Sequence, residues 1–279
     1  MPITLQNSTP AQLHHLHIGS PQADALADFY QRQFTLHASR NGELHVLRGG
    51  TRNVTIASRE QAALLHAGYA LRNAAELDQL AARLQRNGAS LEMADVVLFA
   101  PGAFLVADPQ GRKLAFGVPL SAPGADARAA RLQHTVFQTT ELEAMVRFYV
   151  ETIGFAISDE VVDVDGTVMV VFLRSDDEHH SLAFFRGSQN EWDHHCYETG
   201  AWNDIRDWGD QFARQRIPIF FGPGRHGPGN NLFFMVTDPD GNRLEFSAEL
   251  ERVAAEQIPG VWPHGEYTLN SWGRAWIRS

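Results

Sequence analysis

The sequence predicts an α+β chain of tandem βαβββ modules, each an open, barrel-like mixed sheet. The first observation is an internal repeat, in which Leu13–Ile18 matches Leu132–Phe137 at an offset of 119 residues (134 − 15 for the shared histidine). Later, the Asp-Pro turn at Asp108 recurs at Asp238, at an offset of 130 (238 − 108). Self-similarity of this kind is the signature of repeated structural units. The growth in offset indicates longer loops in the second copy.

The second observation is the order of patterns within a copy, which is strand, helix, then several strands. Thr140 followed by Glu143 is a capping-box pattern that begins a helix. Apolar residues then recur at helical spacing, and Gly154 ends the helix. β-branched and aromatic runs follow, and a second amphipathic helix comes after them. These later elements are expected at residues 167–173, 181–185 and 203–216.

Composition and charge restrict the classes of partner. The chain has 279 residues, 44% of them hydrophobic and 20% charged, which is typical of a globular protein of one or two domains. A net charge of −10 without a basic cluster argues against nucleic-acid binding. No apolar run reaches the roughly 20 residues that span a bilayer, and Met1–Asn7 lacks signal-peptide features, so no membrane partner is expected. A single cysteine, Cys196, excludes an intrachain disulfide and favours a cytoplasmic protein.

Three residues in strand contexts are candidate metal ligands: His134, His195 and Glu245. Two imidazoles and one carboxylate hold a non-haem Fe(II) by one face and leave the opposite coordination positions open. Ligands from three separated strands converge only if a curved sheet brings them together. His194 and His195 are adjacent, so in a strand they face opposite sides and only one of them reaches the metal.

The first copy of the repeat lacks part of this set. Ala115 stands at the position of Glu245, and His66 or its neighbour stands at the position of His195. The first copy is therefore expected to be a scaffold without a site. Four histidines of this copy are expected to be structural, and these are His14, His15, His17 and His66.

Two further motifs carry a resemblance to a known family. A Gly-Pro-Gly-Arg-His-Gly run at 222–227 is followed by Asp-Pro-Asp-Gly at 238–241 and then by Glu245, and a His-His-Ser-Leu-Ala-Phe run occupies 179–184. With these motifs the chain resembles the vicinal-oxygen-chelate (glyoxalase–bleomycin resistance–dioxygenase) superfamily, and within it the two-domain type I extradiol ring-cleavage dioxygenases. The resemblance extends over roughly residues 14–251.

This resemblance implies a function and roles for five residues. His134, His195 and Glu245 would bind Fe(II), less often Mn(II), since the family pattern favours His195 over its neighbour. His180 would be the acid/base, and His226 would contact the substrate ring or its hydroxyl. The enzyme would be an oxidoreductase that inserts both atoms of O2 into the ring of a catechol-type substrate.

The resemblance also implies a domain organisation. Two vicinal-oxygen-chelate domains are expected, a non-catalytic one at 1–119 and a catalytic one at 131–250, joined by a linker at 120–130. Residues 251–279 would form a tail over the site. The tail tryptophans are expected to pack on the barrel, and these are Trp262, Trp272 and Trp276. A homo-oligomer is expected.

One departure from the family keeps other functions open. The family commonly has a tyrosine nine residues after the histidine of the glycine motif, and here position 235 (226 + 9) is Met235, which can donate no proton. The first alternative is a glyoxalase-like isomerase or lyase that uses Ni, Zn or Mn. The second is a metal-free protein that binds a small molecule, as resistance proteins do.

Overall fold

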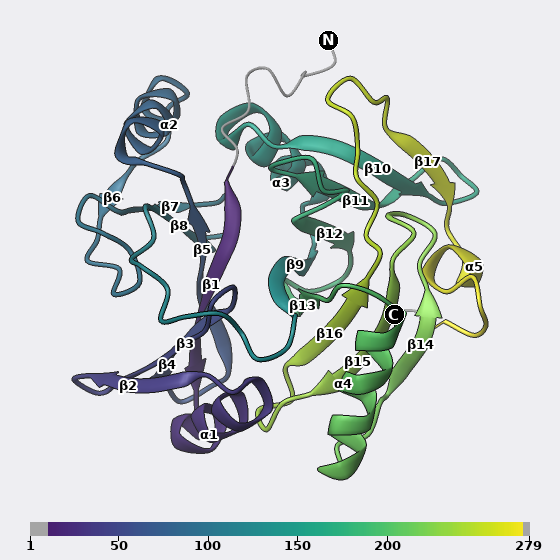
Figure 1. Cartoon of the computed structure of the whole chain (residues 1–279). Helices are drawn as coiled ribbons and strands as arrows, with labels where there is room; N and C mark the ends of the chain where they lie inside the picture. Colours follow the sequence, from purple (N-terminus) through teal and green to yellow (C-terminus); the bar gives the residue numbers. More distant parts are fainter. Residues whose placement is uncertain (1–10, 276–279) are drawn as a thin grey trace.

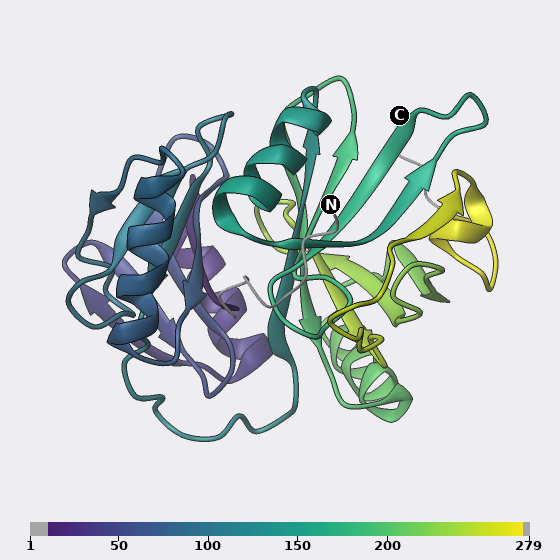
Figure 2. The same ribbon diagram turned by 90° about the horizontal axis from the view of Figure 1, so that it is seen from above.

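The computed structural model describes residues 11–275 and shows two curved sheets standing side by side (Figure 1). The N-terminal residues Met1–Asn7 and the tail residue Trp276 lie outside this range. Among the described residues no helix has the length and apolar character needed to cross a membrane. Figure 2 shows the two sheets as separate modules, with the C-terminal tail on the outer side of the second one.

The first module is an eight-stranded sheet in the order β2-β3-β4-β1-β5-β8-β7-β6. It contains two βαβββ units in succession. Its elements are β1 (Gln12–Ser20), α1 (Ala23–Phe34), β2 (His37–Asn41), β3 (Leu44–Arg48), β4 (Asn53–Ser58), β5 (Ala63–Ala70), α2 (Ala74–Arg86), β6 (Glu92–Met93), β7 (Phe104–Ala107) and β8 (Lys113–Gly117).

The second module is a nine-stranded sheet in the order β14-β15-β16-β13-β9-β12-β11-β10-β17. It repeats the two βαβββ units and adds a strand and a short helix from the tail, so the predicted α+β fold is confirmed. Its elements are β9 (Arg131–Thr139), α3 (Leu142–Arg147), the π-helical η2 (Phe148–Ile153), β10 (Ala156–Val162), β11 (Val168–Arg174), β12 (Leu182–Arg186), β13 (Glu191–Glu198), α4 (Trp202–Arg214), β14 (Phe221–Arg225), β15 (Leu232–Thr237), β16 (Arg243–Ala248), β17 (Gly260–Pro263) and α5 (Glu266–Leu269).

The start of α3 differs from the prediction, because the expected capping box does not form. Thr140 directs its hydroxyl to the side chain of Asn190 instead (3.2 Å), and Glu143 forms an ion pair with Arg186. The backbone amide of Glu141, the residue before the helix, donates to the hydroxyl of Thr139 (3.1 Å). The predicted end is confirmed, since Gly154 adopts a left-handed conformation (φ 92°) after η2.

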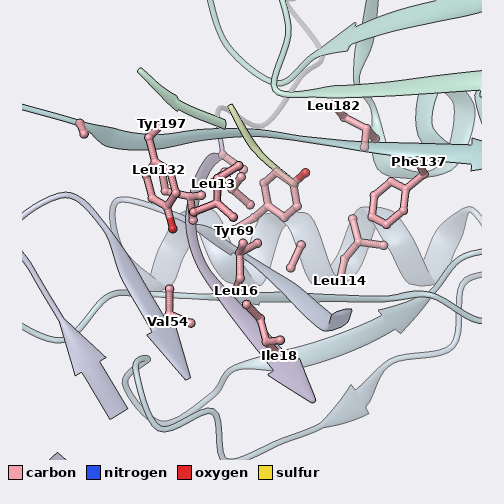
Figure 3. Packing of buried hydrophobic residues seen from close by; sticks show 14 of the residues in the cluster. Leu13, Leu16, Ile18, Val54, Tyr69, Leu114, Leu132, Phe137, Leu182 and Tyr197 are labelled. Carbon is pink, nitrogen blue, oxygen red and sulfur yellow. The ribbon is translucent and has the colours of Figure 1, made fainter. Parts of the chain in front are cut away.

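The two sheets share one hydrophobic core between them. Figure 3 shows side chains of β1, such as Leu16 and Ile18, facing Phe137 and Tyr197 of the second module. Helix α1 adds to this core, because the ring of its Phe34 lies 4.5 Å from the ring of Tyr197. Tyr197 therefore marks the face of β13 that is turned toward the first module. Alternation along the strand then decides which face each neighbouring residue takes.

A β-bulge in β9 sets the register of the strands that form the inner face of the second module. Cys196 pairs with His134, but the next residue, Tyr197, pairs with Leu132, so Gln133 is an extra residue in β9. On the other side of β13, Cys196 pairs with Glu245. The central strands β9, β13 and β16 thus bring His134 and Glu245 to the same level of the sheet.

Candidate metal centre

The curved sheet of the second module encloses a small cavity. It offers about 40 Å³ to the centres of water molecules, more than the roughly 10–15 Å³ that one water needs. Imidazoles and one carboxylate lie at its floor, aromatic and aliphatic side chains form its walls, and the tail helix α5 contributes to its rim. The lining residues are His134, Val136, Val161, Phe172, His180, Phe185, His194, Phe221, His226, Pro228, Met235, Glu245, Thr268 and Leu269.

Three buried side chains from three neighbouring strands converge on this floor: His134 of β9, His194 of β13 and Glu245 of β16. The Nε2 atom of His194 lies 3.2 Å from Oε2 of Glu245, and Nε2 of His134 lies 3.9 Å from the same oxygen. Two ligands at right angles on an ion with bonds of about 2.1 Å would stand about 3 Å apart. The His194–Glu245 distance is close to this spacing, and the His134–Glu245 distance is longer.

The expectation that His195 belongs to this set is wrong, because the structure turns its ring the other way. His195 is fully buried on the core face of β13, the face that also carries Tyr197. Its Nε2 lies 3.1 Å from the hydroxyl of Tyr30 in α1, and its ring stacks on Trp192 at 5.1 Å. The residue that faces Glu245 is His194.

Each of the two histidines at the floor is oriented by the residue before it. Nδ1 of His134 lies 2.5 Å from the side-chain oxygen of Gln133, the extra residue of the bulge, and Nδ1 of His194 lies 2.5 Å from a carboxylate oxygen of Asp193. If each Nδ1 donates its proton to that oxygen, each Nε2 keeps its lone pair for a metal. Oriented imidazoles of this kind accompany most histidine–metal sites.

The carboxylate of Glu245 is held as an anion. The side-chain amide of Asn231 donates to its Oε1 at 3.1 Å. Burial alone would raise the pKa of Glu245, but the contact with His194 and the nearby imidazoles of His226 and His134 outweigh it and hold that pKa well below its usual range. Burial has the opposite sign for an imidazole and would lower the pKa of His194. The hydrogen bonds of His194 to Asp193 and Glu245 more than offset burial, so the pKa of His194 is raised.

His180 stands beside the floor at the end of a buried chain of polar groups. Its ring centroid lies 4.4 Å from that of His134. Its Nδ1 is 3.0 Å from Nδ1 of His179, whose Nε2 is 3.0 Å from a carboxylate oxygen of Asp159. Burial, followed by the neighbouring histidines, lowers the pKa of His180 well below its usual value, so the ring is neutral at pH 7. This places a proton acceptor at the cavity wall.

His226 lies on the opposite wall, where the glycine motif meets the tail. Its ring stacks on Phe233 with centroids 3.8 Å apart, and its Nδ1–H donates to the backbone carbonyl of Leu269 (2.6 Å). Its Nε2 is 3.7 Å from Oε1 of Glu245. Nearby, the amide of Gly227 donates to the carbonyl of Thr268 (2.9 Å), which ties the tail to the rim. His180 and His226 therefore both face the cavity, as their candidate roles require.

Two sulfur atoms lie near the floor. Met235 is 1% exposed, pairs with Glu245 across β15 and β16, and lines the cavity. Cys196 shares the inner face with His194, and its Sγ lies within 4.8 Å of ligand atoms of His134 and Glu245. Burial, then the charge of Glu245, raises the pKa of Cys196 well above its usual value, so it remains a thiol. As a thiol it lies directly beside the two candidate ligands His134 and Glu245.

Sequence reasoning did not single out the groups that orient the ligands. Gln133 and Asp193 each directly precede a histidine of the site. That position in the sequence was the only feature that could have marked them as orienting groups. Asn231 follows a residue of positive φ, Asn230 (φ 51°), at the end of the loop that bears the glycine motif. His179 belongs to the motif at 179–184, which assigned a role to His180 alone.

The chemistry of this donor set fits a divalent metal ion. Two imidazole nitrogen atoms and one carboxylate oxygen point at a common space, and each ligand has an outer partner that fixes its orientation. Ligands on adjacent strands of one sheet lie on one side of such an ion, which leaves the side toward the cavity open. Small molecules with two oxygens could reach it there.

The chain is similar to known proteins in sequence and in fold. A family model described as Glyoxalase/Bleomycin resistance protein/Dioxygenase superfamily matches residues 131–246. Metapyrocatechase 2 of Cupriavidus necator is 30% identical over 147 residues, which cover 51% of this chain and 44% of that relative. The match to the metapyrocatechase of Pseudomonas sp. (strain CF600), at 32% identity, also covers 44% of the relative, so the chain spans less than half the length of either. Biphenyl-2,3-diol 1,2-dioxygenase of Metapseudomonas furukawaii is 26% identical, over 80% of this chain and 82% of its own.

Two solved structures share the fold. The homoprotocatechuate 2,3-dioxygenase of Brevibacterium fuscum, in an anaerobic complex with 3,4-dihydroxyphenylacetate, superposes with a TM-score of 0.84 at 21% identity, covering 98% of this chain and 92% of its own. The Mn(II)-bound glyoxalase of Novosphingobium aromaticivorans superposes with a TM-score of 0.83 at 23% identity, covering 95% of this chain and 91% of its own. At such identities the likeness concerns the fold.

Proposed function

Because residues 131–246 match the model of the glyoxalase/bleomycin resistance protein/dioxygenase superfamily, we propose that the chain is a non-haem Fe(II)-dependent extradiol dioxygenase that opens the ring of a catechol-type substrate with O2. The observation that carries this proposal is the set of two imidazoles and one carboxylate at the floor of an apolar cavity. The dioxygenases among its relatives support it. Under this proposal the protein acts in the cytoplasmic breakdown of aromatic compounds.

The ligands would be His134, His194 and Glu245, holding Fe(II) or, less often, Mn(II). When bound, the metal ion would lower the pKa of a catechol hydroxyl that chelates it and bring the diol and O2 together. Glu245 offers its charge without a competing proton, since its pKa is held low by its hydrogen bonds. Asn231 and Asp193 would keep the carboxylate and the imidazole of His194 in position.

His180 would accept the proton of a substrate hydroxyl and return it later. Its Nδ1 is engaged by His179, which leaves Nε2 for the substrate. General acid–base groups of this kind contribute about 10²–10⁴-fold to rate. His226, whose Nδ1–H is bound to the tail carbonyl, would turn its Nε2 toward a substrate oxygen. The aromatic walls, including Phe172 and Phe221, would hold the ring and exclude water.

A glyoxalase-like isomerase or lyase on the same scaffold is the second candidate. Met235 favours it, because this thioether stands where the dioxygenase family commonly has a tyrosine. The shared fold of the Mn(II)-bound glyoxalase is compatible with it. A metal-free binding protein is the third candidate, and the buried, oriented ligand set argues against it.

Anaerobic reconstitution of the metal-free protein with Fe(II), followed by a panel of catechols in air, tests the proposal. We expect one iron per chain, a yellow ring-opened product, and consumption of one O2 per catechol. Iron binding without product from any catechol, together with turnover of an α-ketoaldehyde thiol adduct by the Ni(II), Zn(II) or Mn(II) form, would favour the isomerase. Absence of metal uptake would contradict both enzymes and leave the binding protein.

Replacement of Met235 by tyrosine is expected to raise kcat/KM for the preferred catechol about 2- to 10-fold. A phenol at this position adds one hydrogen bond to a substrate oxygen, worth about 0.5–1.5 kcal/mol. Met235→Leu is the matched control, since it conserves volume without a donor and should leave kcat/KM near that of the parent. Steady-state kinetics at saturating O2 gives both values. A tyrosine variant that folds and binds iron but gains nothing over the leucine variant would contradict this role.

A further inference from the structure

The walls of the cavity carry no group that could pair with a charged substituent on a bound ring. Six side chains, each from a different strand, form these walls, and every one is a hydrocarbon or a thioether. No lysine or arginine is among the described residues that line the cavity. A substituent that points away from the floor therefore meets apolar atoms. The six wall residues are Val136, Val161, Phe172, Phe185, Phe221 and Met235.

The polar groups closest to these walls already have partners. Thr268 of α5 is the one polar side chain of the described lining besides the histidines and Glu245, and its hydroxyl donates to the carbonyl of Pro263 (2.5 Å). Arg225 directly precedes His226, but its guanidinium donates to the carbonyl of Asn230 (2.6 Å) and pairs with Glu249 (2.7 Å). Neither group is left to hold an anion in the cavity.

The charges at the floor also disfavour a further anion. The carboxylates of Glu245 and Asp193 both contact His194, so the floor already holds negative charge. A divalent ion bound there would be balanced by Glu245 and by one ionised hydroxyl of a catechol. No net positive charge then remains for a carboxylate on the ring, and a charge that is buried without a partner is costly.

Leu269, the last residue of α5, lies where a ring substituent would leave the floor. The ring of His226 stands between the two, because its Nε2 faces Glu245 at 3.7 Å while its Nδ1 donates to the carbonyl of Leu269 at 2.6 Å. Leu269 lines the cavity and is only half-buried. Its side chain therefore belongs to the outer part of the wall, where the cavity meets solvent.

We propose that the cavity accepts catechols whose ring substituents are uncharged and apolar and rejects those that carry a carboxylate, and that Leu269 decides between them. This inference rests on the proposed dioxygenase function and names its substrate class. An apolar substituent would displace water from Phe172 and Phe185, which is favourable in proportion to the apolar area covered. A carboxylate would lose its hydration at the same place and gain no partner.

Comparison of 4-ethylcatechol with 3,4-dihydroxyphenylacetate on the Fe(II)-loaded chain tests the proposal, because the two differ chiefly in the carboxylate. We expect kcat/KM to be higher for 4-ethylcatechol by about 100-fold or more. The methyl ester of the acid, which keeps its length but not its charge, should recover most of that difference. Affinities measured by calorimetry without O2 should follow the same order, and they report on the cavity even if no ring is opened.

Replacement of Leu269 by arginine should admit the acid. A guanidinium at this edge can pair with both oxygens of a carboxylate, so kcat/KM for 3,4-dihydroxyphenylacetate should rise about 10-fold or more, and that for 4-ethylcatechol should not. Tyr267→Arg is the matched control, since Tyr267 lies on the same helix, is 79% exposed and does not line the cavity. It should leave both constants near the parent values. Leu269→Lys repeats the test if the arginine variant does not fold.

The outcomes separate this inference from the function on which it rests. Equal affinity and equal turnover of the acid and 4-ethylcatechol would overturn the inference and leave the proposed dioxygenase standing. An equal gain for the acid in Tyr267→Arg and Leu269→Arg would overturn the role of Leu269, since net charge alone would then explain it. Cleavage of neither catechol would contradict the proposed function. The anaerobic affinities would then decide: equal values overturn the inference, and the expected preference for 4-ethylcatechol supports it.

Discussion

Replacement of His194 by alanine is expected to abolish Fe(II) binding and turnover. The ring of His194 lies between the carboxylates of Asp193 and Glu245, and its loss leaves both anions buried without their shared partner. Because loss of an outer partner alone typically costs 10- to 100-fold in affinity, loss of a ligand should cost more. The iron content of protein reconstituted without oxygen, measured per folded chain, checks this.

The matched control is the neighbouring histidine. His195→Phe keeps an aromatic ring against Trp192 and removes the contact with the hydroxyl of Tyr30, which still reaches Asp238 at 3.2 Å. We expect iron content and kcat to stay near the parent values and the free energy of unfolding to fall by about 1–3 kcal/mol. The opposite pattern, with iron lost in His195→Phe and retained in His194→Ala, would contradict the arrangement of β13.

Replacement of His180 by phenylalanine is expected to lower kcat by about 10²–10⁴-fold while the bound iron remains. The ring touches that of His134 but lies outside the set of ligands, so its loss should remove a proton acceptor and leave the metal in place. Stopped-flow measurement of product formation, alongside iron analysis of the same sample, separates the two effects. A variant that loses its iron in proportion to its activity would contradict a catalytic role.

The row of hydrogen-bonded side chains behind His180 predicts a graded effect on kcat. His179 holds Nδ1 of His180 and reaches a carboxylate oxygen of Asp159, and the same oxygen accepts from the indole N–H of Trp262 in β17 (2.7 Å). His179→Phe should therefore lower kcat less than His180→Phe does, with KM little changed, and should shift the pH at which kcat is half-maximal. A purely structural role would instead lower stability without moving the pH profile.

The sequence by itself determined the architecture and most of the site. The repeat of Leu13–Ile18 at 132–137, and the helix pattern that follows each copy, predicted two modules of βαβββ units, because periodicity and turn residues act locally. The difference between Glu245 and Ala115 at matching positions of the two copies indicated Glu245 as the candidate carboxylate ligand. His180 and His226 were found from motifs, and the structure brings both to the cavity.

Only the tertiary structure decided which face of the sheet each side chain of a strand occupies. Alternation showed that His194 and His195 face opposite sides, but the choice depends on the register of β13 against β9 and β16. That register includes an extra residue in each strand, Gln133 in β9 and Asp193 in β13, and Tyr197 packs against α1. A shift of one residue turns every side chain of a strand to the other face, and contacts between segments far apart in the chain determine it.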